Sequence, residues 1–231
     1  MQTLRTLAAA AILGAVVGAT AAPLTLTGLP DLVGGTPAVT RVFRADLASV
    51  GLGSFQSITI RDNSSGLGGS PGQFSGFDLD AIVISDQLCA TAACVTGLTG
   101  FAVFDFSPAG TLFTPGVQRA PADAKLFGTD ASGTRVDDLM ATLASFDANG
   151  TTDATAFGFL SMGDNGILSF NLTSALNTAG LYLYLGEVGD NGEALAGSIE
   201  IDRDPVNVPE PSTLALAVLA LGALRAGHRR R

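Results

Sequence analysis

The chain has 231 residues, of which 21 are acidic, 12 are Lys or Arg and one is His, so its formal net charge is −9. An acidic chain of this kind is a poor partner for nucleic acid, which is bound by basic surfaces. Its 29 glycines are nearly twice the usual share, which indicates many turns rather than long helices.

The first 21 residues have the pattern of a secretory signal peptide. Arg5 supplies the positive charge, residues 7–17 are apolar, and Ala19-Thr20-Ala21 forms a small-x-small cleavage site. We expect cleavage after Ala21, because cleavage one residue later would place Pro23 directly after the scissile bond. The alternative, an uncleaved N-terminal anchor, is disfavoured because the apolar run is too short to span a bilayer.

Residues 22–201 are predicted to form one domain, followed by a linker at 202–208. This length is sufficient for one domain with a sizeable core. Residues 22–208 contain 20 acidic and 7 basic side chains, a net charge near −13. Such a surface is soluble and can attract cations.

Short runs of alternating apolar and polar residues recur along this domain, separated by Gly, Asn and Asp. This pattern predicts a mainly β fold, an antiparallel β-sandwich of jelly-roll-like form. Residues 136–146 fit either a helical face or the end of a strand. The predicted strands are 24–27, 39–47, 55–60, 77–84, 101–106, 157–160, 167–172, 181–185 and 199–201.

The tetrapeptide Gly-Asp-Asn-Gly occurs twice, at 163–166 and 189–192, each time after a run of strand character. Its Asn-Gly pair tolerates positive φ, so we expect type I′ hairpin turns. The alternative is a calcium site, because Asp and Asn oxygens on a tight glycine turn are suitable ligands for a hard cation.

Asp78 and Asp80 form a second candidate site, because alternate residues of a strand share one face and lie about 6.6 Å apart. Phe77, Leu79, Ala81 and Val83 are then expected on the opposite face. Two carboxylates so placed repel each other unless water, an Arg or a cation lies between them. The sequence leaves two interpretations open, a solvated strand face or a calcium site.

Cys89 and Cys94 are the only cysteines, and four residues separate them. In an exported chain an even pair this close predicts a disulfide. A zinc site is disfavoured because two further ligands would be required.

The composition of the predicted domain argues against an enzyme. The only histidine is His228, near the C-terminus, so no Ser-His-Asp, Cys-His or zinc-histidine site can form within residues 22–208. A glycosidase that uses two carboxylates stays possible on this ground. The absence of Trp and the presence of only Tyr182 and Tyr184, which share one face of a strand, disfavour it.

The last 23 residues combine three features of a sorting signal. Pro209-Glu210-Pro211 is followed by an apolar run at 213–224, then by Arg225 and the basic end 228–231. A helix over the apolar run would be about 18 Å long, against a bilayer core of about 30 Å. The basic end would stay in the cytoplasm, which leaves the proline motif on the outer side. The alternative is an ordinary weak C-terminal anchor.

This tail resembles the PEP-CTERM sorting signal of Gram-negative bacteria. The resemblance covers about a tenth of the chain and rests on Val208-Pro209-Glu210-Pro211-Ser212-Thr213-Leu214, the short apolar helix and the basic end. It implies recognition and processing by exosortase, a membrane protease of the transpeptidase type. It also implies transient anchoring in the inner membrane and a link to exopolysaccharide or biofilm.

Residues 157–201 resemble a second group, secreted bacterial proteins with galactose-binding-like or discoidin-like sandwiches. The resemblance rests on two segments, from Phe159 to Phe170 and from Gly180 to Glu193. Met162 and Asn165 stand in place of the usual Leu and Gly. Some relatives of that fold bind sugars or calcium.

Taken together, the sequence predicts an exported, exosortase-sorted protein of the cell surface or extracellular matrix with a structural or adhesive role. The alternative is a calcium-dependent carbohydrate-binding module, and a glycan-cleaving enzyme ranks third.

Overall fold

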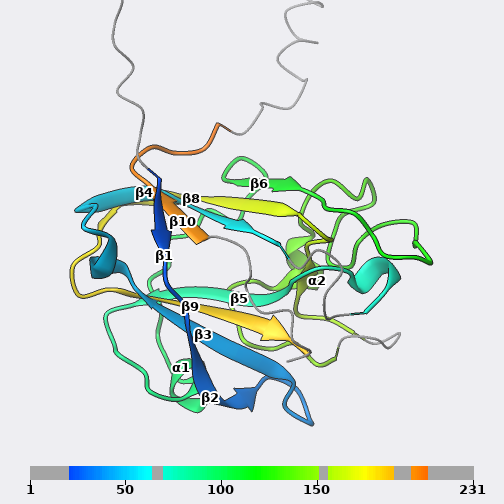
Figure 1. The fold of residues 1–231 in the computed structure, drawn as a ribbon, viewed down its shortest axis with the longest axis horizontal. Helices are drawn as coiled ribbons and strands as arrows, with labels where there is room; N and C mark the ends of the chain where they lie inside the picture. The colour runs from blue at the N-terminus through cyan, green and yellow to red at the C-terminus, as the bar shows by residue number, and fades with distance from the viewer. Residues whose placement is uncertain (1–20, 64–69, 151–155, 190–198, 208–231) are drawn as a thin grey trace, which may run out of the picture.

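The computed structural model describes residues 21–63, 70–150, 156–189 and 199–207. Within these residues, two antiparallel sheets of five strands each face one another in a β-sandwich, and the helices are short (Figure 1). The first sheet has the order β1 (Ala22–Leu24), β10 (Ile199–Asp202), β4 (Ser54–Arg61), β8 (Ile167–Asn177), β6 (Thr111–Thr114). The second has the order β2 (Thr27–Val33), β3 (Thr40–Asp46), β9 (Tyr182–Val188), β5 (Asp78–Ser85), β7 (Leu160–Ser161).

The helical elements are single turns in the connections. They are η1 (Leu47–Val50), η2 (Gly72–Phe74), α1 (Ala92–Thr96) and α2 (Asp138–Ala141). Each α-turn has a side-chain cap, Thr91 at α1 and Asp137 at α2, which accepts a backbone N–H that the helix leaves unbonded. The ambiguous stretch 136–146 therefore contains only one helical turn, at its start.

Strand pairing in this fold is nested along the chain. The pairs β1·β10, β3·β9, β4·β8 and β5·β7 lie one inside the next in sequence, and they alternate between the two sheets. The chain therefore behaves as one long antiparallel ribbon wrapped into two layers. Ala22 pairs with Ile201, so both ends of the ribbon lie at the same edge of the first sheet (Figure 1).

The core fills the space between the inner faces of the two sheets. Apolar side chains that alternate along the central strands supply it, as period-2 patterning requires. The core side chains with no exposed surface include Phe55, Ile58, Ile60, Leu79, Ile84, Leu160, Leu168, Phe170, Leu183 and Leu185.

A β-bulge changes which residues of β5 face the core. The pairing of β5 with β9 shifts register between Leu79 and Ile82. The extra residue reverses the alternation, so Leu79, Ile82 and Ile84 lie in the core while Val83 packs on the outer face. The expectation that Phe77, Leu79, Ala81 and Val83 share one face is therefore wrong beyond the bulge.

The turn at 163–166 is not a hairpin. It connects β7 of the second sheet to β8 of the first, and it is closed by the Gly166 N–H to the Gly163 carbonyl at 2.9 Å. Of its two central residues only Asn165 has positive φ, whereas a type I′ turn requires both. The prediction of a type I′ hairpin is wrong here, because the two strands pair with other partners. The second copy, at 189–192, extends beyond the described residues.

Most of the other predicted strands are present in the structure, where each pairs with a neighbouring strand of its sheet. The strands predicted at 39–47, 55–60, 77–84, 167–172, 181–185 and 199–201 are confirmed as β3, β4, β5, β8, β9 and β10. Residues 101–106 form no strand, and only Phe104 makes an isolated bridge, to Leu172. The sequence does not predict β6, nor β2 beyond Thr27. The strands predicted at 24–27 and 157–160 overlap β1, β2 and β7 only at Leu24, Thr27 and Leu160.

Candidate functional site

The sorting motif Pro209, Glu210 and Pro211 lies outside the described residues, as do the apolar run and the basic end. Asp78, Asp80, Cys89 and Cys94 all lie within the described residues. Residues 203–206, predicted as part of a linker, are hydrogen-bonded to the first sheet. The Asp204 carbonyl accepts from Ser57 Oγ at 2.7 Å, and Val206 exchanges two hydrogen bonds with the Asn171 side chain at 2.7 and 3.1 Å.

Asp78 and Asp80 flank Leu79, a core residue, so their side chains lie on the outer face of the second sheet. Neither side chain has any exposed surface. The interpretation as a solvated strand face is therefore wrong. Segments that cross this face, around Phe127, Ala148 and Phe159, cover the two carboxylates.

Asp80 is bound by three hydrogen-bond donors. Thr40 Oγ1 donates to Oδ2 at 2.5 Å, and the backbone N–H groups of Asp147 and Ala148 donate to Oδ1 at 3.1 and 3.2 Å. Burial raises the pKa of Asp80 to about 7, and the hydrogen bonds from Thr40, Ala148 and Asp147 only partly counteract it. Asp80 thus fixes the segment at 147–148 to the sheet.

Asp78 lies opposite Ser161 of the edge strand β7 and accepts a hydrogen bond from Ser161 Oγ at 2.5 Å. The backbone N–H of Ser161 donates to the Phe127 carbonyl. Phe127 in turn stacks on Phe159, with ring centroids 4.4 Å apart, and Phe74 completes the cluster. Asp78 therefore lies beside an aromatic cluster that packs on the outer face.

These contacts bear on the predicted calcium site. A calcium ion at Asp80 would compete with three donors that already bind the lone pairs of both carboxylate oxygens. Within the described residues, no group of three or more His, Cys, Asp or Glu side chains is arranged to hold a metal ion. Calcium binding at Asp78 and Asp80 stays a prediction.

The disulfide between Cys89 and Cys94 is confirmed, with Cα atoms 5.5 Å apart. The segment it closes covers the middle of the second sheet's outer face. The Tyr184 hydroxyl accepts from the Cys89 N–H at 2.8 Å and donates to the Gln87 carbonyl at 2.6 Å, while Arg44 Nη1 donates to the Cys89 carbonyl at 2.7 Å. Two side chains of the sheet thereby hold the disulfide segment in place.

Beyond this segment the outer face is open, and sequence reasoning did not find the hollow there. It has a volume of about 360 Å³, and its polar lining includes Arg44, Asp46 and Tyr182. Arg44 and Asp46 alternate on a correctly predicted strand, and Tyr182 was expected on one face with Tyr184. The sequence does not give the register between β3 and β9, which places Tyr182 beside Asp46 and so forms the hollow.

A larger groove of about 540 Å³ runs beside β5. Its lining is mainly apolar, with Phe101, Phe104 and Phe146 among the side chains, and contains no charged residue. Phe101 is bound to β5 by a backbone hydrogen bond, in which its N–H donates to the Ile84 carbonyl at 2.9 Å. Apart from Thr96 and Ser145, the side chains of the groove are apolar, so it offers no charged group to a ligand.

No helix in the described part of the chain has the length and apolar character needed to cross a membrane. The chain matches no protein-family profile, no curated protein and no solved structure. Its function is therefore argued from its own residues.

The buried Asp80 predicts that the protein loses stability as pH rises from about 4 to about 7. An unfolded Asp has a pKa near 3.9, so in this range the folded state retains a proton that the unfolded state has lost. The free energy of unfolding then falls with rising pH. In Asp80→Asn, whose amide resembles the protonated acid, we expect a flatter profile in chemical denaturation at pH 4 to 8. Parallel profiles for the two proteins would contradict the assignment.

Calcium removal tests the metal prediction. Because donors occupy both oxygens of Asp80, we expect the melting temperature to change by less than about 1 °C between millimolar calcium and chelator. A rise of several degrees that disappears in Asp78→Ala would show that calcium binds the native state at this site. The melt is made under non-reducing conditions so that the disulfide stays intact.

Proposed function

We propose that this chain is an exported protein of a Gram-negative bacterium, displayed at the cell surface or in the extracellular matrix in a structural or adhesive role without enzymatic activity. In this proposal a signal peptide, residues 1–21, is removed, and the tail at 209–231 holds the precursor in the inner membrane until an exosortase-type enzyme processes it. Extracellular polysaccharide is the proposed environment of the released domain.

The observation that carries this proposal is the position of the two ends of the domain. β1 begins at Ala22, directly after the expected cleavage site, and pairs with β10, the last strand in the described part of the chain. Val206 is held on the first sheet by Asn171. Pro209 is three residues beyond Val206, at most about 10 Å of chain. Asn171 lies on β8 next to the core residue Phe170, so Val206 is held on the outer face of the first sheet. Both ends of the described domain thus lie against the first sheet, and neither proposed removal would interrupt a described strand.

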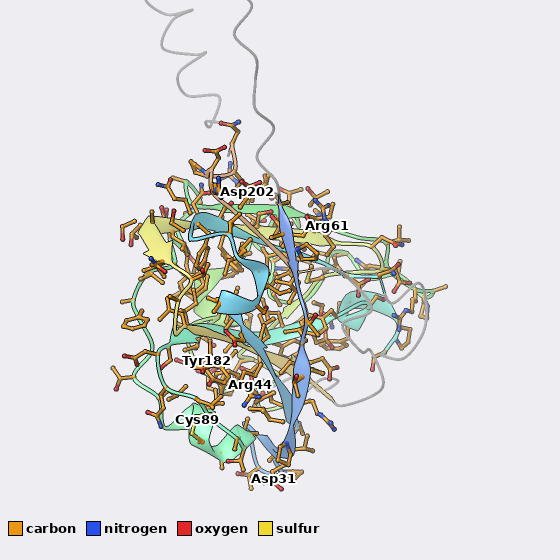
Figure 2. All side chains as sticks on the ribbon, turned by 60° about the vertical axis from the view of Figure 1, so that its left-hand side comes forward. Asp31, Arg44, Arg61, Cys89, Tyr182 and Asp202 are labelled. Atoms are coloured by element: carbon orange, nitrogen blue, oxygen red, sulfur yellow. A yellow bond between two sulfur atoms is a disulfide. The ribbon has the colours of Figure 1, made fainter. Side chains whose placement is uncertain are left out.

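This arrangement limits how the precursor can stand on the membrane. With so short a connection, the first sheet would face the bilayer, and the second sheet would point away from it. Figure 2 shows Arg61 and Asp202 toward the side where the described ends lie, and Arg44, Tyr182 and Cys89 farther from it. The outer face of the second sheet is then the part available to other molecules.

We also propose that the sandwich is a jelly roll. The four nested pairs that alternate between the sheets support this, because a long antiparallel ribbon wrapped into two layers gives that arrangement. β2 and β6 would be additions at the edges of the two sheets. The resemblance of residues 157–201 to galactose-binding-like sandwiches is compatible with this topology.

The alternative that the sequence leaves open is a calcium-dependent carbohydrate-binding module. It requires a cation at Asp78 and Asp80. The three donors that already bind Asp80 favour a structural role for that carboxylate instead.

Replacement of Pro209, Glu210 and Pro211 by alanine tests the proposed sorting. We expect the variant to accumulate as a precursor in the inner-membrane fraction, because the processing enzyme would no longer recognise it. The matched control is Pro205→Ala, which changes a proline outside the motif. Fractionation followed by immunoblotting measures both variants. If the triple variant reaches the surface in the same amount as the control, the motif does not direct sorting.

A further inference from the structure

The outer face of the second sheet is covered unevenly. On β3, the outward residues are Thr40, Val42, Arg44 and Asp46 in order. Thr40 is buried with Asp80, and Val42 lies under the disulfide segment together with Tyr184. The disulfide segment does not cover the sheet beyond Arg44. The uncovered part of the outer face is the hollow of about 360 Å³, which Arg44 and Asp46 line.

The hollow combines the groups that recognise a sugar. Register places Tyr182 opposite Asp46 and Thr27 opposite Arg44 on neighbouring strands. The half-buried ring of Tyr182 offers an apolar surface with a polar tip. The full lining consists of Thr25, Thr27, Arg44, Asp46, Ser49, Leu88 and Tyr182. Its volume lies within the range of small-molecule sites.

Arg44 supplies the cation of this hollow. Its Nη1 donates to the Cys89 carbonyl, and among the described residues it forms no ion pair. A guanidinium has five N–H donors, and their fork matches a carboxylate. Because the predicted domain has a net charge near −13, a half-buried arginine with donors to spare is a distinctive feature of this surface.

The charged groups of the hollow are held in position before any ligand arrives. The Cys89 carbonyl that fixes Arg44 belongs to the disulfide segment, which Tyr184 anchors through two hydrogen bonds. Asp46 is fixed by its role as cap of η1, where Oδ1 accepts from the Ala48 N–H at 2.9 Å. Preorganisation of this kind lowers the entropic cost of binding.

We propose that the hollow binds a uronate unit of an acidic polysaccharide, without calcium. Arg44 receives the carboxylate of the sugar, the ring of Tyr182 packs against the sugar face, and Asp46 with the surrounding hydroxyls bonds the sugar hydroxyls. This binding is independent of the sorting proposal. It would give the displayed domain a ligand in an acidic extracellular matrix.

The test is titration calorimetry of the full-length chain with tetragalacturonate in the presence of EDTA. The neutral probe is the same oligosaccharide with its carboxylates reduced to alcohols. We expect saturable binding of the acidic sugar and at least about tenfold weaker binding of the neutral one, because a hydrogen-bonded charge pair is lost. Equal affinity for both sugars, or no binding of either, would overturn the proposal.

Two matched variants distinguish binding in the hollow from a general attraction between the protein's positive charges and the acidic sugar. Arg44→Gln should weaken binding at least about tenfold. Arg61→Gln removes the same charge from an exposed arginine that pairs with Glu200 at 3.5 Å, far from the hollow (Figure 2), and should change the affinity by less than about twofold. Equal losses in both variants would assign the binding to overall charge and contradict the site.

A second variant keeps the test decisive if Arg44→Gln fails to fold. Thr27→Val preserves shape and removes one hydroxyl opposite Arg44. We expect it to melt like the unchanged protein and to bind the acidic sugar several-fold more weakly. Unchanged affinity in this variant would contradict the proposed contacts, and binding that appears only after calcium is restored would contradict the calcium-free site.

Discussion

The structure depends on the pairing of strands that lie far apart in the sequence. β1 pairs with β10 across almost the whole domain, and β3·β9, β4·β8 and β5·β7 are nested inside this pair. Loop closure over such distances costs entropy before any contact compensates it, so folding of this topology is expected to be slow. The gain is a domain whose first and last described strands are neighbours at one edge of the first sheet.

This pairing pattern also explains why the two sheets carry different segments of the chain. The first sheet carries both ends and the segment that Asn171 holds at Val206. The second sheet carries the long connections on its outer face. Where these connections cross, they bury Asp78, Asp80 and Tyr184. Where they stop, Arg44 and Tyr182 border the open hollow.

The buried carboxylates illustrate how one residue type can serve structure in one place and recognition in another. Asp80 has no contact with solvent, and its oxygens bind Thr40 and the backbone of residues 147–148. Asp46 lies six residues farther along β3 than Thr40, and it is exposed. Its Oδ1 caps η1, and its other carboxylate oxygen, Oδ2, is the one that a ligand could use. Burial and partners, rather than the presence of a carboxylate, decide which role each can have.

Much of the fold was predictable because alternation on a half-buried strand is a local signal. The strands around Val42, Ile58 and Leu183 follow it, and the disulfide follows from the spacing of its cysteines. Three features depend on distant partners: the bulge in β5, the passage of the 163–166 turn between the sheets, and the reduction of residues 101–106 to one isolated bridge. Sequence patterns do not contain that information.

The candidate sites show the same limit. The shared face of Asp78 and Asp80 could be predicted from their spacing, but their burial depends on segments more than forty residues away. The hollow brings together Thr27, Arg44 and Tyr182, which are far apart in sequence. Only the register of β3 with β2 and β9 makes them neighbours.

The central claim is that the folded domain lies between two processing sites, one on each side of the described strands β1 to β10. The most direct measurement is the intact mass of the protein recovered from the outside of the cell. We predict a chain that begins at Ala22 and has lost the basic end 228–231 by processing near Pro209 to Pro211. A surface protein that retains residues 1–21, or the complete C-terminus to Arg231, would contradict the account.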